Sequence, residues 1–123
     1  MAAPELIALL TCDATAADPH GKITLYGLFD VIWATQFPMR HPQLAVFLKC
    51  RFPGPGEAQV LLESPEGEPL LALAPVRAAA AGSVQVVYQL TNVEFPGPGV
   101  YHFRLLSSGG AVGAVPLEVR TRQ

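Results

Sequence analysis

The stretch that decides the fold is Gly21-Lys22-Ile23-Thr24-Leu25-Tyr26-Gly27-Leu28-Phe29-Asp30-Val31-Ile32-Trp33, the longest run of β-branched and aromatic residues in the chain. Such residues favour strands, and no helical pattern of similar length competes with this run. We therefore expect residues 21–33 to form the central strand. Gly27 interrupts the alternation, and an isolated glycine in a strand marks a bulge or a bend. The strand is expected to change sheets there.

The segments on either side of this strand differ in character. Residues 5–12 are apolar on both parities, which fits a strand buried on two sides, with a helix as the open alternative. Residues 13–21 contain Asp18-Pro19 and Gly21 and predict a loop. After the strand, Pro38 and Pro42 in residues 36–42 predict an extended crossover between two sheets rather than a central strand.

The rest of the chain alternates between apolar and polar residues with the period of a strand. It predicts strands over residues 43–52, 57–63, 68–76, 83–93, 99–105 and 111–121. Ser64-Pro65-Glu66-Gly67 is typical of a hairpin turn, and residues 77–82 are too short for more than a loop or a single helical turn. Pro116 places its strand at a sheet edge.

One pentapeptide occurs twice. Phe52-Pro53-Gly54-Pro55-Gly56 and Phe95-Pro96-Gly97-Pro98-Gly99 are identical, and each precedes a predicted strand, a turn of small residues and a second strand. Either the two are equivalent corners of two sheets, or similar turn chemistry recurs wherever strands are joined. The second copy continues into Gly99-Val100-Tyr101-His102-Phe103. This pattern resembles a corner of immunoglobulin-like sandwiches, in which the tyrosine hydroxyl bonds the corner backbone. Tyr101 is then the corner tyrosine.

These patterns predict an all-β fold. We expect a two-sheet immunoglobulin-like β-sandwich of about eight mostly antiparallel strands, formed by residues 1–123 as a single domain. The resemblance of the corner, rather than the alternation, gives the immunoglobulin-like part of this expectation.

Composition limits the function. The net charge is −2, which disfavours nucleic acid as a partner. Charged residues make up 15% of the chain and hydrophobic residues 50%, where soluble domains carry about 25% charged residues. Some apolar surface is therefore expected to lie exposed, as at a subunit contact. Residues 1–13 fit neither a secretory signal nor a membrane span, so we expect a cytoplasmic protein without a membrane partner.

Several side chains could carry chemistry, and each also has a structural explanation. Cys12 and Cys50 lie in apolar runs and are interpreted as reduced core thiols, with an inter-strand disulfide as the alternative. His20 and His41 could meet Asp13 or Asp18 at a metal, although their spacing matches no metal motif and turn or capping roles are expected. His102 and Arg104 fit a solvated strand face. We expect no bound metal and no cofactor.

The candidates for catalysis are treated in the same way. Cys12, Cys50, Ser107 and Ser108 lack the neighbours of an activated nucleophile, so inert thiols and turn serines are expected. Glu57, Glu63, Glu66 and Glu68 cluster around one hairpin as solvated charge. Asp30 lies in the most apolar stretch, and if buried it must accept hydrogen bonds or pair with Lys22 or Arg40. A structural role is expected for it, and no catalytic residue is assigned.

Two further features have binding as an alternative. The glycine-rich segments 53–56 and 96–99 open no helix, so they are interpreted as turns rather than phosphate loops. The aromatic residues Tyr26, Phe29, Trp33, Phe37 and Phe47 could form a sugar-binding platform, although a core role is expected for most of them.

Several segments together resemble a family of small bacterial proteins of unknown function. They are Leu9-Leu10-Thr11-Cys12-Asp13, the stretch from Gly21-Lys22 to Phe29-Asp30, the joint Phe37-Pro38 with His41-Pro42, and Phe95-Pro96 with Gly99, Tyr101 and Phe103. The resemblance covers nearly the whole chain. It implies a fold and a bacterial source, and it transfers no site residue.

Three hypotheses follow. The first is a non-enzymatic β-sandwich that acts by protein-protein association, as a homodimer or as a subunit docked on another protein. The second is a small-ligand or carbohydrate-binding module that uses exposed aromatic residues near Trp33 and Phe37. The third is a metal-dependent or acid/base enzyme, which requires His20, His41 and a carboxylate such as Asp18 or Asp30 to converge.

Overall fold

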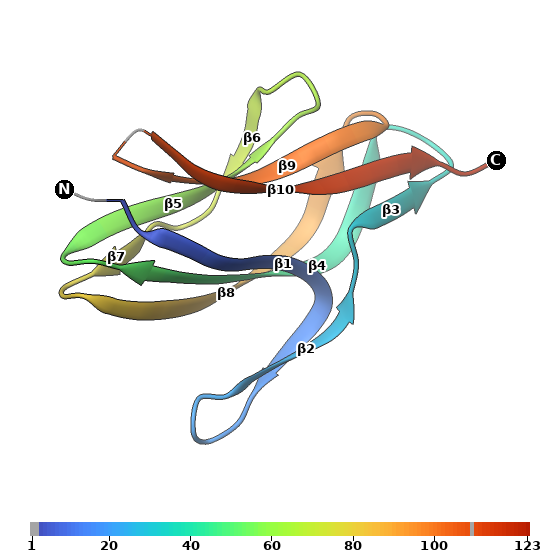
Figure 1. The fold of residues 1–123 in the computed structure, drawn as a ribbon. Coiled ribbons are helices and arrows are strands. Elements are labelled where there is room, and N and C mark those ends of the chain that lie inside the picture. The colour runs from blue at the N-terminus through green and yellow to red at the C-terminus, as the bar shows by residue number, and fades with distance from the viewer. Residues whose placement is uncertain (1–2, 109) are drawn as a thin grey trace.

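The computed structural model describes residues 3–108 and 110–123. These residues form ten strands and no helix (Figure 1). The strands are β1 (Glu5–Ala17), β2 (Ile23–Leu28), β3 (Val31–Ala34), β4 (Met39–Phe52), β5 (Gly56–Glu63), β6 (Pro69–Ala72), β7 (Val76–Ala78), β8 (Gly82–Phe95), β9 (Gly99–Ser107) and β10 (Gly110–Thr121). The all-β prediction is confirmed. Two predicted strands, residues 21–33 and 68–76, are each divided in two.

The strands form two sheets. The four-stranded sheet has the order β2-β1-β4-β8, and the six-stranded sheet has the order β3-β10-β9-β5-β6, with β7 also paired to β5. Neighbouring strands are antiparallel except β3 and β10, which are parallel. The sheets lie over each other as the two layers of a sandwich (Figure 1). The predicted two-sheet sandwich is therefore observed.

The core lies between the layers and is built from alternating positions. In β4, Leu44, Val46 and Leu48 are fully buried, as are Val60 in β5 and Phe103 in β9. One cluster contains these side chains together with Leu62, Leu105, Leu117 and Val119. Because successive strand residues point to opposite faces, the residues between them, such as His102 and Arg104 in β9, point away from this core. The alternation in residues 43–52, 57–63 and 99–105 predicts that these apolar side chains of β4, β5 and β9 point inward, and the structure confirms this.

The two identical pentapeptides occupy equivalent positions in the two sheets. Phe52 ends β4 and Phe95 ends β8, which are neighbours in the four-stranded sheet. Gly56 and Gly99 begin β5 and β9, which are neighbours in the six-stranded sheet. Each pentapeptide therefore carries the chain from the first layer to the second, and because β4 and β8 are antiparallel the two crossovers lie at opposite ends. Both phenylalanines are buried.

Tyr101 makes the corner hydrogen bonds that its position predicts. Its hydroxyl donates to the Gly97 carbonyl at 2.7 Å and accepts from the Gly97 N–H at 3.3 Å. Its ring is 1% exposed and meets the Phe95 ring edge to face, with the centroids 5.0 Å apart. The buried hydroxyl thus has hydrogen-bond partners in both backbone groups of Gly97, as buried polar groups usually do.

The deciding stretch is not a central strand, and this expectation is wrong. Residues 23–28 form β2 at the edge of the four-stranded sheet, and residues 31–34 form β3 at the edge of the six-stranded sheet. The predicted change of sheet is confirmed. Between the two strands the Phe29 N–H donates to the Thr11 carbonyl at 3.1 Å, and the Glu118 N–H donates to the Asp30 carbonyl at 2.8 Å. The link is therefore bonded to both layers in turn.

Two prolines lie in the interior of strands, at places where the strand has one neighbour. The crossover predicted over residues 36–42 does carry the chain from β3 to β4, but β4 begins at Met39 and so includes Pro42. Pairing of β4 with β1 ends at Ala45, and pairing of β10 with β3 begins only at Glu118, beyond Pro116. Each proline therefore lies on a locally open strand edge, where its missing N–H removes no ladder bond.

Candidate functional site

A two-stranded arm projects from the sandwich. Pairing of β1 with β4 ends at Cys12 opposite Ala45, and residues 14–17 then pair with residues 23–26 of β2 alone. We call residues 13–28 the arm, which stands out from the layers in Figure 1. The sequence predicted a loop over residues 13–21. In its place β1 continues to Ala17, and the turn is at residues 18–22, where the Asp18 carboxylate accepts from the His20 and Lys22 N–H groups at 2.8 and 2.9 Å.

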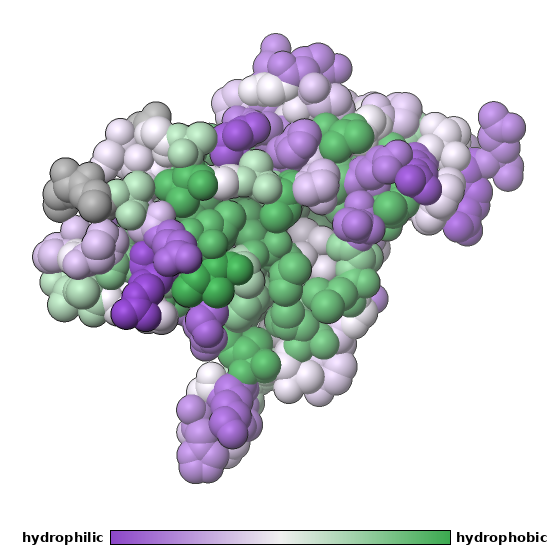
Figure 2. All heavy atoms as spheres, viewed as in Figure 1, coloured by the Kyte–Doolittle hydropathy of each residue, from purple (hydrophilic) through white to green (hydrophobic). Residues whose placement is uncertain are grey.

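An apolar groove runs beside the base of the arm. It has a volume of about 370 Å³ and lies between β1 and β10. We call it the apolar seam; it is lined by Leu9, Leu10, Thr11, Leu28, Phe29, Asp30, Val115 and Pro116. In Figure 2 hydrophobic residues gather over this face, between the upper layer and the arm. The two sheets therefore leave an apolar surface open on this side.

The exposed apolar side chains are concentrated in the two stretches of chain that contain β1, β2 and β3. Among the described residues, eight large hydrophobic side chains are exposed, and five of them belong to residues 5–12 and 22–33. The five are Ile7 (47%), Leu10 (39%), Tyr26 (54%), Leu28 (60%) and Trp33 (48%). These are the two stretches whose apolar residues occupy both parities in the sequence. Their second apolar face meets solvent rather than another layer of the same chain.

The outer edge of the arm is formed by β2, which has no strand of the described residues paired on its outer side. β2 is the last strand of its sheet, and its sequence Ile23-Thr24-Leu25-Tyr26-Gly27-Leu28 contains neither a charged residue nor a proline. Natural edge strands usually carry such residues because they prevent pairing with other chains. The edge of β2 lacks this protection.

A second concave surface surrounds Trp33. It has a volume of about 890 Å³ and is lined by β3 and the links beside it, the start of β4, Arg122, and the arm residues Asp13, Gly27 and Leu28. Trp33 lies opposite Arg120 in the parallel pair of β3 and β10. The guanidinium carbons of Arg120 and Arg122 both lie 5.3 Å from the centroid of the indole ring. We call this surface the Trp33 concavity.

The cations beside Trp33 differ in their partners. Arg120 donates two hydrogen bonds to the Glu118 carboxylate, at 2.8 and 3.0 Å, and these bonds lower the pKa of Glu118 and raise the pKa of Arg120. Arg40 lies 3.6 Å from Glu94 in an exposed pair. No carboxylate of the described residues lies within 4.0 Å of the Arg122 guanidinium. Arg122 is therefore the cation of this surface that is open to a ligand.

The histidine and aspartate candidates lie in different places. His20 is in the turn of the arm, whereas His41 lines the Trp33 concavity and lies 5.8 Å from Phe29, ring centroid to ring centroid. Within the described residues, no three His, Cys, Asp or Glu side chains are grouped so that they could hold a metal ion. Asp30 is exposed in the link between β2 and β3, so the expectation that depended on its burial does not apply.

The aromatic candidates divide between surface and core. Tyr26 and Trp33 are exposed, and Phe29, Phe37 and Phe47 are half-buried. Phe29 and Phe37 pack against the core cluster. A core role for most of the five is therefore observed only in part, because none of them is fully buried. The residues that the sequence did not associate with Trp33 are Arg120 and Arg122.

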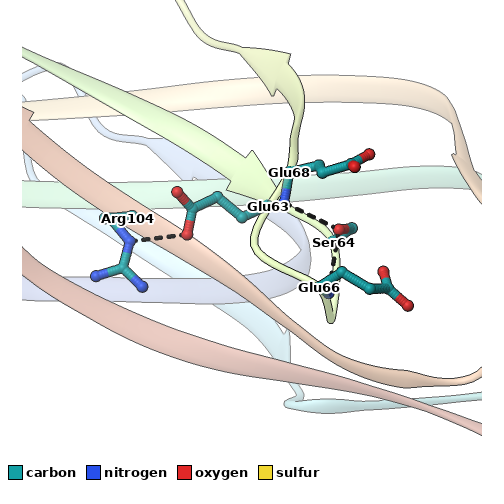
Figure 3. A network of polar contacts seen from close by, with 5 residues as sticks. All are labelled: Glu63, Ser64, Glu66, Glu68 and Arg104. Carbon is teal, nitrogen blue, oxygen red and sulfur yellow. Dashed lines mark hydrogen bonds and ion pairs between the residues drawn. The ribbon is translucent and has the colours of Figure 1, made fainter.

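The glutamates of the β5–β6 hairpin have structural roles or face solvent. Glu63 pairs with Arg104 at 2.8 Å, across β5 and β9, as Figure 3 shows. The Ser64 hydroxyl accepts from the N–H groups of Glu66 and Glu68 at 3.2 and 3.1 Å. This confirms the predicted turn. In the other cluster of small residues, the Ser107 hydroxyl donates to the Glu57 carbonyl at 2.8 Å.

Cys12 and Cys50 are free and buried. Burial raises the pKa of both thiols, which disfavours the thiolate that reacts with electrophiles.

We predict that both thiols react about 100-fold more slowly with a disulfide reagent in the folded protein than in denaturing guanidinium chloride. Because the raised pKa favours the neutral thiol, the folded state loses stability as the pH rises above about 8.5. One thiol that reacts at the free-cysteine rate would contradict the buried placement.

The described residues contain no helix with the length and apolar character needed to cross a bilayer. Residues 7–120 match the model of a family of unknown function, DUF6941. The chain belongs to this family. The resemblance found in the sequence is thereby confirmed as membership of an unknown-function family, and this membership assigns no function to the surfaces described above.

Comparison with other proteins adds information about the fold. No curated protein has a matching sequence. The DUF6941 chain is similar in structure to part of the alkylpurine DNA glycosylase AlkC of Pseudomonas fluorescens, solved bound to DNA that contains an abasic site analog. The TM-score is 0.57 at 13% sequence identity, and the match covers 95% of this chain and 30% of the glycosylase chain. The chain thus spans less than a third of that protein, and the likeness concerns the fold.

Proposed function

We propose that this DUF6941 protein is a non-enzymatic β-sandwich that acts by association, and that it forms a homodimer through the apolar seam and the edge of β2. The observation that carries the proposal is the concentration of exposed apolar side chains on one region, with Leu10 and Leu28 at the groove and Tyr26 on the arm. Contiguous apolar surface of this kind marks interaction sites.

The total surface of the chain supports a partner. The accessible surface is 7001 Å², whereas a compact monomer of 13.1 kDa is expected to expose about 6,400 Å². The excess is about 600 Å², and a hairpin that projects from the sandwich, as the arm does in Figure 1, adds surface of this kind. A standard interface covers about 800 Å² on each partner. An interface that covered the arm and the seam would bring the exposed surface into the ordinary range.

A second copy of the chain fits this surface better than a partner of opposite charge. In a two-fold dimer the same patch meets itself, so like charges at its centre would repel. β2 carries no charge from Ile23 to Leu28, and two such strands can pair antiparallel without repulsion. An isolated two-stranded hairpin is only marginally stable, so pairing would also stabilise the arm.

Sedimentation velocity of the purified protein tests this proposal. We expect a dimer for the wild type and a monomer for Leu28→Glu, because two carboxylates would be buried across the two-fold axis. Leu70→Glu is the matched control: Leu70 is 40% exposed on β6, and this variant should remain a dimer. A wild type that is monomeric at about 100 μM, or that binds only a different protein, would overturn self-association. Loss of the dimer in Leu70→Glu alone would place the interface elsewhere.

The remaining expectations are proposals as well. We propose no nucleic-acid partner, because the net charge of −2 does not favour phosphate backbones; the DNA in the AlkC structure is bound to a protein that this chain matches over 30% of its length. Two buried free thiols are typical of a reducing compartment, which supports the cytoplasm as the location. The bacterial source stays a prediction.

A further inference from the structure

We propose that the Trp33 concavity binds a small organic anion that carries a flat apolar group. The site adjoins the contact proposed at β2 and shares Leu28 and Phe29 with the apolar seam, but the proposal rests on Trp33 and Arg122, which do not line the seam. It combines an exposed indole, Arg120 of β10, Arg122 just after β10 and several apolar lining residues. Its volume of about 890 Å³ lies within the range of ligand sites, about 300–1,000 Å³.

The charge of the concavity selects an anion. Asp13 is the one carboxylate among its lining residues, which also include Arg40, Arg122 and His41. Arg40 is paired with Glu94, so Arg122 supplies the unpaired positive charge of this surface, in a chain whose net charge is −2. Arg120 is already bonded to Glu118, so its guanidinium orients Trp33 rather than binds a ligand. Arg122 has no such partner, and its planar guanidinium can donate two parallel hydrogen bonds to a carboxylate.

The apolar part of the ligand follows from the other lining residues. Phe29, Ile32, Pro38 and Met39 contribute the apolar lining, and Trp33 remains 48% exposed. A neutral sugar needs an open aromatic face to stack on, but two guanidinium groups already lie 5.3 Å from the indole centroid. Arg122, the unpaired one of the two, instead favours a ligand with negative charge. The structure thus narrows a general small-ligand or carbohydrate site to an aromatic or otherwise planar carboxylate.

The test is a titration of the ¹⁵N-labelled full chain with 2-naphthoate, followed by amide and indole NMR signals. Trp33 is the single tryptophan of the sequence, so its indole N–H signal reports directly on the concavity. The neutral isostere 2-naphthamide is the matched ligand. We expect naphthoate to shift the Trp33 indole and Arg122 amide signals and to bind about tenfold more tightly than the amide.

Two variants distinguish specific binding at the concavity from nonspecific binding. Arg122→Gln should weaken naphthoate binding about tenfold and leave naphthamide binding unchanged. Arg77→Gln removes another exposed arginine, on β7, which is paired with Glu57 away from the concavity, and should change neither. Both substitutions are at exposed positions, and an unperturbed spectrum elsewhere shows that the fold is intact. The proposal is overturned by equal binding of the two ligands, by shifts confined to the apolar seam, by no effect of Arg122→Gln, or by no binding at millimolar ligand.

Discussion

Phe95→Ala is expected to lower the free energy of unfolding by about 3–5 kcal/mol, the usual cost of emptying a buried phenylalanine site. Phe95 is 0% exposed and ends β8, and its ring supports the ring of Tyr101. Removing it leaves a cavity under the crossover and frees the tyrosine that bonds Gly97. Since domains are stabilised by about 5–15 kcal/mol in total, this single change would remove a large share. Guanidinium denaturation followed by Trp33 fluorescence measures it.

The repeated pentapeptide supplies a companion variant for this prediction. Phe52 is 1% exposed at the equivalent crossover, so Phe52→Ala should cost a similar amount. Val100 lies beside Tyr101 in sequence and is 42% exposed, so Val100→Ala should change the stability by less than about 0.5 kcal/mol. All variants must be compared at one protein concentration, because self-association would shift apparent stability. A loss below about 1 kcal/mol for Phe95→Ala would show that the crossover does not depend on this ring.

Local patterns predicted most of the fold because the residues that decide it are close in sequence. Alternation over residues 43–52 and 99–105 gave β4 and β9 and their inward faces, and the turn residues 64–67 placed a hairpin. The corner role of Tyr101 followed from its spacing to the preceding Pro-Gly segment. In each case the physical cause acts over a few residues, through side-chain direction or turn conformation.

The position of a strand within its sheet was not predictable in the same way. Residues 21–33 are apolar on both parities, which is typical of a strand buried on two sides, yet β2 and β3 lie at sheet edges. An exposed apolar residue at a site of association and an apolar residue buried in the core cannot be told apart from the sequence. The extent of β1 was missed for a related reason: Asp13–Ala17 are small or polar residues that pair only with β2.

The Trp33 concavity was predicted from the sequence only in part, for a different reason. The sequence pointed to Trp33 and Phe37, but Arg120 and Arg122 come from the opposite end of the chain. They reach the indole because β3 and β10 pair in parallel, and no local pattern encodes a parallel pair of strands so far apart. The pairing of β3 with β10 therefore brings the charged residues of the site to Trp33.

Gly27→Val is expected to release the arm from the sandwich. Gly27 has a φ of +67°, which a β-branched residue adopts only as an outlier, and a Cβ there would lie 2.3 Å from Oδ2 and 3.2 Å from Cβ of Asp13. Strain and overlap together amount to about 3 kcal/mol. Residues 14–17 and 23–26 pair only with each other, so the chain can relieve this strain by opening the arm while the two sheets stay folded.

The loss should therefore be local, and hydrogen exchange measures it. Amides of the arm are expected to exchange about 100-fold faster in Gly27→Val, whereas those of β9 change by less than about tenfold. Gly54→Val is the control, because a Cβ there meets nothing within 4 Å. Adding Asp13→Ala to Gly27→Val removes the overlap but not the positive φ, so it should restore only part of the protection. Unchanged exchange in the arm of Gly27→Val would mean that this glycine does not set the bend, whereas equally fast exchange in β9 would mean that the arm and the sandwich unfold together.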